Sequence, residues 1–142
     1  MQDDHVATST IEIAAPPDRV WSVITDAAAA REFMFGTELD ADWTEGGELS
    51  WRGEWEGRPY EDHGTVLAIE PPRRLVHTHF SARREDDEAP ENHHTLTWTL
   101  EGDDETVLTL AQDNNPTAEA AAHSAAMWDA LVAKVKEIAE RP

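Results

Sequence analysis

The fold of this chain is decided by residues 64–80, which read GTVLAIEPPRRLVHTHF. Two apolar runs, 65–69 and 75–80, flank the pair Pro71 and Pro72. Proline has no backbone N–H and cannot continue a β ladder, so the pair predicts a turn. Because the connection is so short, the two flanking strands are expected to be antiparallel neighbours.

The chain on both sides of this hairpin repeats the alternation of apolar and polar residues that is typical of half-buried strands. The positions expected to share the buried faces are Ser9, Ile11, Ile13, Leu49, Trp51, Trp55, His94, Leu96, Trp98, Leu100, Thr106, Leu108 and Leu110. Gly46 and Gly47 predict a turn before one of these strands. Residues 57–63 are expected to form a loop or hairpin, and residues 81–92 a charged loop. The pattern predicts about six antiparallel strands after the first one.

Two short helices are expected between the first strand and the others. Residues 16–26 begin with two prolines followed by Asp18, which suit the first turn of a helix. Residues 27–35, AAAAREFMF, predict a second helix that ends at Gly36.

A long helix is predicted near the C-terminal end of the sequence. Asn115 is expected to cap it, with Pro116 at its first position, and it extends to about Glu140. Its apolar stripe consists of Ala121, Ala125, Trp128, Leu131, Val132 and Val135. Such a stripe has to be buried, and a curved sheet with one inner face offers the surface for it.

The size of the side chains on this helix predicts a cavity beneath it. Ala121, Ala122 and Ala125 are small and would leave space between helix and sheet, whereas Trp128 and Leu131 would close the other end. A space between a sheet and a helix is a common place for a small ligand.

Composition narrows the class of protein. A chain of 142 residues suits a single domain, residues 1–142, and the absence of cysteine excludes disulfides and thiol chemistry. The formal net charge of −19 disfavours binding to nucleic acid or to anionic membranes. The acid excess fits either solubility or adaptation to high salt.

With no signal peptide and no membrane-spanning run, we expect a cytoplasmic protein, as a monomer or homodimer.

Three segments resemble a known family. They are residues 11–26, residues 46–79 and residues 127–137, and they look like the START-like superfamily, also called SRPBCC. The specific parts are a Pro-x-x-Val-Trp opening, a Gly-Gly turn before a strand, and the pattern G-x-V-x-x-I-x-P-x-R-x-L. The closest branch is similar to the bacterial homologues of the activator of heat-shock-protein ATPase. The resemblance implies an α+β helix-grip fold. In that fold a curved antiparallel sheet of about seven strands wraps around a long C-terminal helix, with two short helices after the first strand.

The resemblance also implies which residues meet a ligand. By period two, Leu75, His77 and His79 share one face, and the resemblance turns this face into the cavity. Similar proteins usually carry aromatic residues at positions 77 and 79, so a more polar cavity is expected here. The expected ligand-binding residues are Trp51, Leu75, His77, His79, Trp98, Met127, Trp128 and Leu131. A second interpretation stays open, in which both imidazoles hydrogen-bond within the core or lie at its rim.

Motifs for enzymes and metals are missing from the sequence. It has no nucleophile elbow, phosphate loop, dinucleotide fingerprint or H-E-x-x-H pair, so we assign no catalytic residue, cofactor or metal. The predicted function is therefore binding of a small, largely apolar ligand that carries a polar group. One alternative is a co-chaperone-like module that binds a chaperone partner. The other is a cyclase- or hydrolase-like enzyme that uses the cavity histidines.

Overall fold

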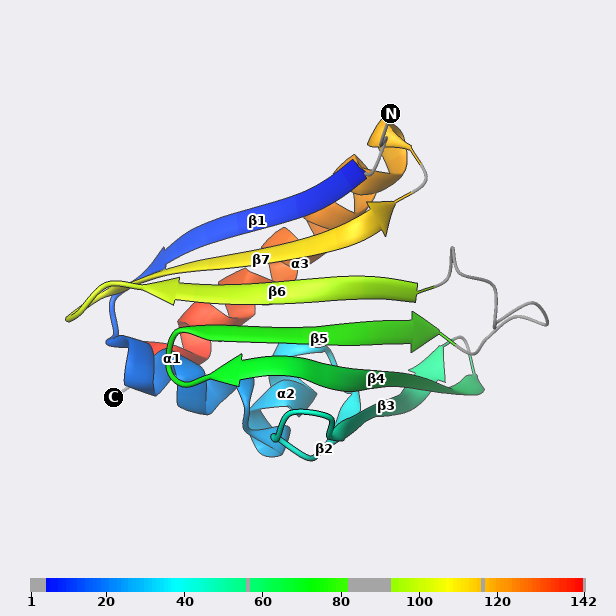
Figure 1. Ribbon diagram of the computed structural model, residues 1–142, viewed down its shortest axis with the longest axis horizontal. Helices are drawn as coiled ribbons and strands as arrows, with labels where there is room; N and C mark the ends of the chain where they lie inside the picture. Colours follow the sequence, from blue (N-terminus) through cyan, green and yellow to red (C-terminus); the bar gives the residue numbers. More distant parts are fainter. Residues whose placement is uncertain (1–4, 56, 82–92, 116, 142) are drawn as a thin grey trace.

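The computed structural model describes residues 5–55, 57–81, 93–115 and 117–141 of an α+β protein (Figure 1). Seven antiparallel strands form one curved sheet in the order β1-β7-β6-β5-β4-β3-β2, and the long helix α3 runs behind it. The elements are β1 (His5–Ile13), α1 (Pro17–Ile24), α2 (Ala27–Phe33), β2 (Glu38–Ala41), β3 (Glu48–Trp55), β4 (Arg58–Glu70), β5 (Arg74–Ser81), β6 (His93–Glu101), β7 (Thr106–Asn115) and α3 (Ala118–Ala139). The predicted fold class is confirmed. Among the described helices, none is both long and apolar enough to cross a bilayer.

The central hairpin forms as predicted, with β4 and β5 antiparallel on either side of the proline turn. Residues 57–63 were expected to form a loop or hairpin, and the hairpin is confirmed: β4 begins at Arg58, which pairs with Trp55 of β3. Pro59 lies at the very start of β4, where a missing N–H is tolerated. The charged loop expected at residues 81–92 lies almost wholly outside the described residues.

Capping of α3 differs from the prediction. The helix begins at Ala118, and Thr117 caps it by accepting a hydrogen bond from the backbone N–H of Ala120 at 3.0 Å. Asn115 instead ends β7, where it pairs with His5 of β1 and donates its side-chain amide to the His5 carbonyl at 2.9 Å. Asn115 and Thr117 are both residue types that cap helices well, but Asn115 lies in β7, which pairs with β1, and so Thr117 is the cap.

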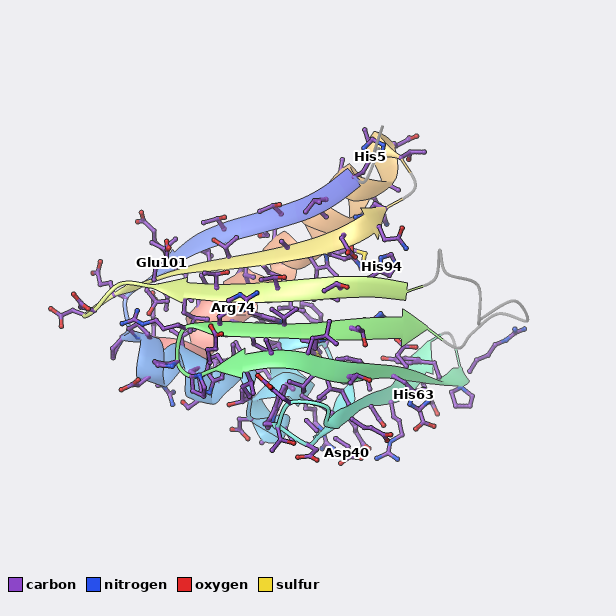
Figure 2. The ribbon with its side chains drawn as sticks, in the orientation of Figure 1. His5, Asp40, His63, Arg74, His94 and Glu101 are labelled. Atoms are coloured by element: carbon purple, nitrogen blue, oxygen red, sulfur yellow. The ribbon has the colours of Figure 1, made fainter. Side chains whose placement is uncertain are left out.

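The core lies between the inner face of the sheet, defined as the face turned toward α3, and the three helices. The predicted alternation on the strands is confirmed at Leu96, Trp98 and Leu100, which are all buried. The fully buried core side chains include Ile13, Val20, Phe33, Leu49, Leu75, Leu108, Leu110, Val132 and Val135. The opposite face carries exposed side chains such as His63 and Glu101 (Figure 2). Burial of one face of the sheet and one stripe of α3 is thus the main source of stability.

The acidic surface leads to a first prediction. Ion pairs such as Arg31–Glu38 and Lys134–Glu137 are exposed and contribute little, so much of the charge of −19 repels itself. We expect the melting temperature to rise with potassium chloride, most steeply where the Debye length falls from about 30 Å to about 10 Å. Calorimetry from roughly 10 to 100 mM salt measures this, with sucrose as an uncharged control. An equal rise in sucrose, or no rise in salt, would contradict the prediction.

Candidate functional site

A cavity of about 420 Å³ lies between the inner face of the sheet and the middle of α3. It is lined by Met34, Phe35, Thr37, Trp51, Tyr60, Asp62, His77, His79, Leu96, Trp98, Met127, Trp128, Ala130 and Leu131. Phe35 and Met127 are 65% and 53% exposed, so they mark its mouth. The volume falls in the range of roughly 300–1,000 Å³ that is usual for small-molecule sites, and most of the wall is apolar.

All but one of the ligand-binding residues expected from the sequence line this cavity. They are Trp51, His77, His79, Trp98, Met127, Trp128 and Leu131. Leu75 points to the same face but is only 1% exposed, in the core beyond the cavity, opposite Trp98 on β6. The alanines at the start of α3, Ala121, Ala122 and Ala125, are not among the lining residues either. The space therefore lies under the middle of the helix and not under its alanine-rich start.

Several lining residues were missed by sequence reasoning. Tyr60 and Asp62 come from the part of β4 that was expected to be a loop or hairpin, and period two from Val66 would have placed them on the inner face. Phe35 follows α2 with a left-handed backbone (φ 55°), directly before Gly36 (φ 99°), which turns the chain toward β2. No pattern in the sequence indicates that turn beyond the glycine itself.

The first of the two cavity histidines is fully hydrogen-bonded within the protein. The indole N–H of Trp98 donates to Nε2 of His77 at 3.0 Å, and Nδ1 of His77 lies 3.0 Å from the carbonyl oxygen of Thr78. An indole N–H can only donate and a carbonyl can only accept, so His77 is a neutral ring with its proton on Nδ1. Burial lowers the pKa of His77 from its ordinary 6.5 to about 4. The hydrogen bond to Thr78 raises this pKa, and the nearby His79 lowers it further.

The second histidine belongs to a polar corner of the cavity, formed by His79 and Asp62. Nε2 of His79 lies 3.1 Å from Oδ2 of Asp62, and the His79 ring packs against Trp51 with centroids 4.9 Å apart. The other oxygen of this carboxylate, Oδ1, is buried without a hydrogen-bond partner in the part of the chain that the structure describes. Asp62 as a whole is only 8% exposed. The polar corner therefore contains, next to the cavity wall, a carboxylate oxygen that has no partner among the described residues.

The arrangement limits the chemistry of the site. No group of three His, Cys, Asp or Glu side chains that could hold a metal ion occurs within the described ranges. Both nitrogens of His77 are already engaged, so that ring has no lone pair left for a metal or a ligand. Acid–base chemistry would fall to the pair of His79 and Asp62.

A curved antiparallel sheet that grips a C-terminal helix around a lined cavity defines a START-like (SRPBCC) protein of the helix-grip type. A model of the family described as "Activator of Hsp90 ATPase homolog 1-like protein" matches residues 14–140. The chain belongs to this family, which confirms the resemblance seen in the sequence. No curated protein matches the chain significantly.

Solved structures of similar proteins have the same fold. The solution structure of ChR145 from Cytophaga hutchinsonii is 35% identical, with a TM-score of 0.86, and the match covers 99% of this chain and 97% of that one. CalU16 from Micromonospora echinospora is 20% identical, with a TM-score of 0.70 over 98% and 87% of the two chains. PFC0360w from Plasmodium falciparum, an HSP90 activator, is 21% identical, with a TM-score of 0.62 over 79% and 74%. At this identity the last two show a common fold.

Proposed function

We propose that this protein binds a small, largely apolar molecule with one polar group in the cavity beneath α3. The observation that carries the proposal is the cavity itself, about 420 Å³ of space between the sheet and α3, open at its mouth and lined by tryptophans and other apolar side chains. A concave site with such a wall removes most of the surface of a small apolar ligand from water. A ligand that fills it would also gain packing contacts with the wall.

The wall of the cavity supports this choice of ligand. Trp51, Trp98, Trp128 and Leu96 supply broad apolar surfaces, whereas most of the polar lining residues come from the paired strands β4 and β5. Pockets of this composition bind through the apolar surface and orient the ligand through a few polar groups. Entry would take place between Phe35 and Met127, whose exposed side chains lie at the mouth.

A substitution that blocks the cavity tests the proposal. Ala130 lines the cavity but is exposed on α3, so Ala130→Trp should place an indole in the mouth without disturbing the core. We expect binding of the uncharged fluorescent probe N-phenyl-1-naphthylamine to weaken about tenfold or more, because the indole occupies the probe's space. Fluorescence titration of the purified protein measures the dissociation constant.

The matched control is Ala122→Trp, which changes an exposed alanine on the same helix, two turns before Ala130 and outside the cavity lining. It should leave the dissociation constant of the probe within a factor of about two, and both variants should keep their helical circular dichroism. Probe binding that is equally strong in wild type and Ala130→Trp, or absent in the folded wild type, would overturn the proposed function.

A second candidate is a co-chaperone-like role, favoured by the family description and by the fold shared with an HSP90 activator. Such a module would use a continuous exposed apolar patch over a filled core. The exposed apolar side chains of the described sheet, Val6, Leu67 and Val107, lie on β1, β4 and β7, and the core contains a cavity. These features favour ligand binding. A rise in the ATPase rate of a purified Hsp90-type chaperone on addition of this protein would favour the second candidate.

A further inference from the structure

We propose that the polar group of the ligand is a hydrogen-bond donor that carries positive charge, so that the ligand class is apolar amines. This inference rests on the proposed function and names the chemistry of its ligand. The feature that carries it is the polar corner, where a buried carboxylate oxygen of Asp62 faces no donor from the described protein.

The charge of the cavity wall has one sign. Asp62 is the only Asp or Glu among the described lining residues, and the same lining contains neither Lys nor Arg. Its Oδ2 is hydrogen-bonded to His79, whereas Oδ1 is buried and has no donor among the described residues. A buried charged acceptor without a donor is unfavourable, so a ligand donor that reaches this carboxylate, after a small rotation of the Asp62 side chain, would supply the missing hydrogen bond.

The indole N–H groups of two tryptophans on the wall are already paired. The N–H of Trp98 donates to His77, and the N–H of Trp128 lies 3.3 Å from Oε1 of Gln112. These indoles therefore offer an entering molecule their ring faces, while their N–H groups stay bonded to the protein. A ligand carboxylate would meet the negative charge of Asp62 without a Lys or Arg in the described lining to offset it, and like charges in a desolvated site repel strongly.

Aromatic faces around the polar corner add to the preference for a cation. The ring of Trp51 packs against His79, and Trp51, Tyr60 and Trp98 line the same cavity. The faces of such rings attract an ammonium group, most strongly where water is excluded. The overall charge of −19 also raises the local concentration of cations around the protein. The carboxylate of Asp62, the aromatic wall and the negative surface charge thus all favour a positively charged ligand.

Three probes with one naphthalene body test the inference. They are 2-(1-naphthyl)ethylamine, 2-(1-naphthyl)ethanol and 1-naphthaleneacetic acid, titrated calorimetrically into the wild-type protein at pH 8.0. We expect the amine to bind about tenfold or more tightly than the alcohol, and the acid to bind weakest, because a charge-assisted hydrogen bond forms only with the amine. In Asp62→Asn the amine should lose this advantage, so that the dissociation constants of the amine and the alcohol come within a factor of about two of each other.

Two controls separate the polar corner from the general surface charge. Asp103→Asn removes the same charge from an exposed turn and should keep the preference for the amine. In 1 M potassium chloride the surface field is screened, whereas a buried pair is screened much less, so the wild-type preference should persist. This second measurement decides the question even if Asp62→Asn fails to fold.

Each outcome has a separate meaning. If the alcohol binds but the amine binds no more tightly, the inference falls and the proposed function stands. A preference that survives in folded Asp62→Asn, or vanishes in 1 M salt, also overturns the inference, because the surface field then explains it. Absence of binding by all three probes to the folded wild type would overturn both the inference and the proposed function.

Discussion

Gly64→Ala is expected to destabilise the protein by about 3 kcal/mol, a large loss for the addition of a single methyl group. Gly64 begins the sequence pattern that decides the fold, and it lies in β4 where this strand passes Thr78 of β5. A Cβ atom at Gly64 would overlap the Thr78 carbonyl oxygen and come within 3.0 Å of the Trp51 ring. The neighbour is backbone in the middle of a sheet, so it cannot move aside without breaking the ladder.

The effect of Gly64→Ala on the unfolded state is smaller and raises the stability of the protein. Replacing glycine by alanine reduces the freedom of the unfolded chain and by itself stabilises a protein by about 0.4–1 kcal/mol. Because the overlap at Gly64 outweighs this gain, we expect the melting temperature to fall by about 10 °C. Thermal unfolding followed by circular dichroism measures it.

Gly53→Ala provides the matched control, since Gly53 is also an inner-face glycine, in β3. Its Cβ would lie 2.7 Å from the hydroxyl oxygen of Tyr60, which is the far end of a side chain and can swing away. The loss is then mainly the 2.8 Å hydrogen bond between Tyr60 and Thr37, about 1 kcal/mol. Equal losses for the two glycine variants would contradict the geometry of the β4–β5 approach.

His77→Phe is expected to change how stability depends on pH. Between pH 6.5 and pH 4 the unfolded chain binds a proton at His77 and the folded protein does not, so the wild type loses stability as pH falls through this window. The shift of the pKa from 6.5 to about 4 corresponds to about 3 kcal/mol, fully present above pH 6.5 and lost below pH 4. In His77→Phe this contribution is absent, so the free energy of unfolding should change less with pH between 4 and 6.5.

The same substitution is unfavourable at neutral pH, because it leaves the buried N–H of Trp98 without an acceptor. We expect His77→Phe to be about 2 kcal/mol less stable than the wild type at pH 7. Near pH 4.5 the difference should shrink or reverse. Urea unfolding at both pH values measures the two free energies of unfolding, and stability curves that run parallel would show that His77 does not carry the predicted proton linkage.

Two further variants isolate the hydrogen bond. In a Trp98→Phe background, which has no indole N–H, His77→Phe should cost about 1 kcal/mol less than it does in the wild type, as a double-mutant cycle reports. His123→Gln changes an exposed histidine on α3 and should leave the pH dependence between 4 and 6.5 as in the wild type.

Much of the architecture could be predicted because its signals are local. The alternation in residues 93–101 and the proline turn after Glu70 each specify a face or a reversal over a few residues, and the structure confirms both. The prediction failed where two local signals competed. Asn115 and Thr117 are both good caps, and pairing of Asn115 with His5, 110 residues away in the chain, decided between them.

The candidate site was predictable to the same extent. Period two placed His77 and His79 on one face, and the resemblance to a family turned this face inward, where both residues line the cavity. Asp62 was missed because its segment was expected to be a loop or hairpin, so no strand face was assigned to it. Phe35 was missed because its left-handed backbone depends on how the chain leaves α2.

The sequence by itself determined which residues alternate, where the chain turns and which side chains share a face, because these follow from the backbone geometry of a single strand or helix. Only the tertiary structure decided what each histidine does. His77 meets Trp98 of β6 and is held as a neutral ring, whereas His79 meets Asp62 of β4, whose other carboxylate oxygen has no donor among the residues that the structure describes. Those partners lie 21 and 17 residues away in the chain. They are brought together by the cross-strand register, which depends on the whole sheet and on a bulge between Val66 and Ala68 that no local pattern announces.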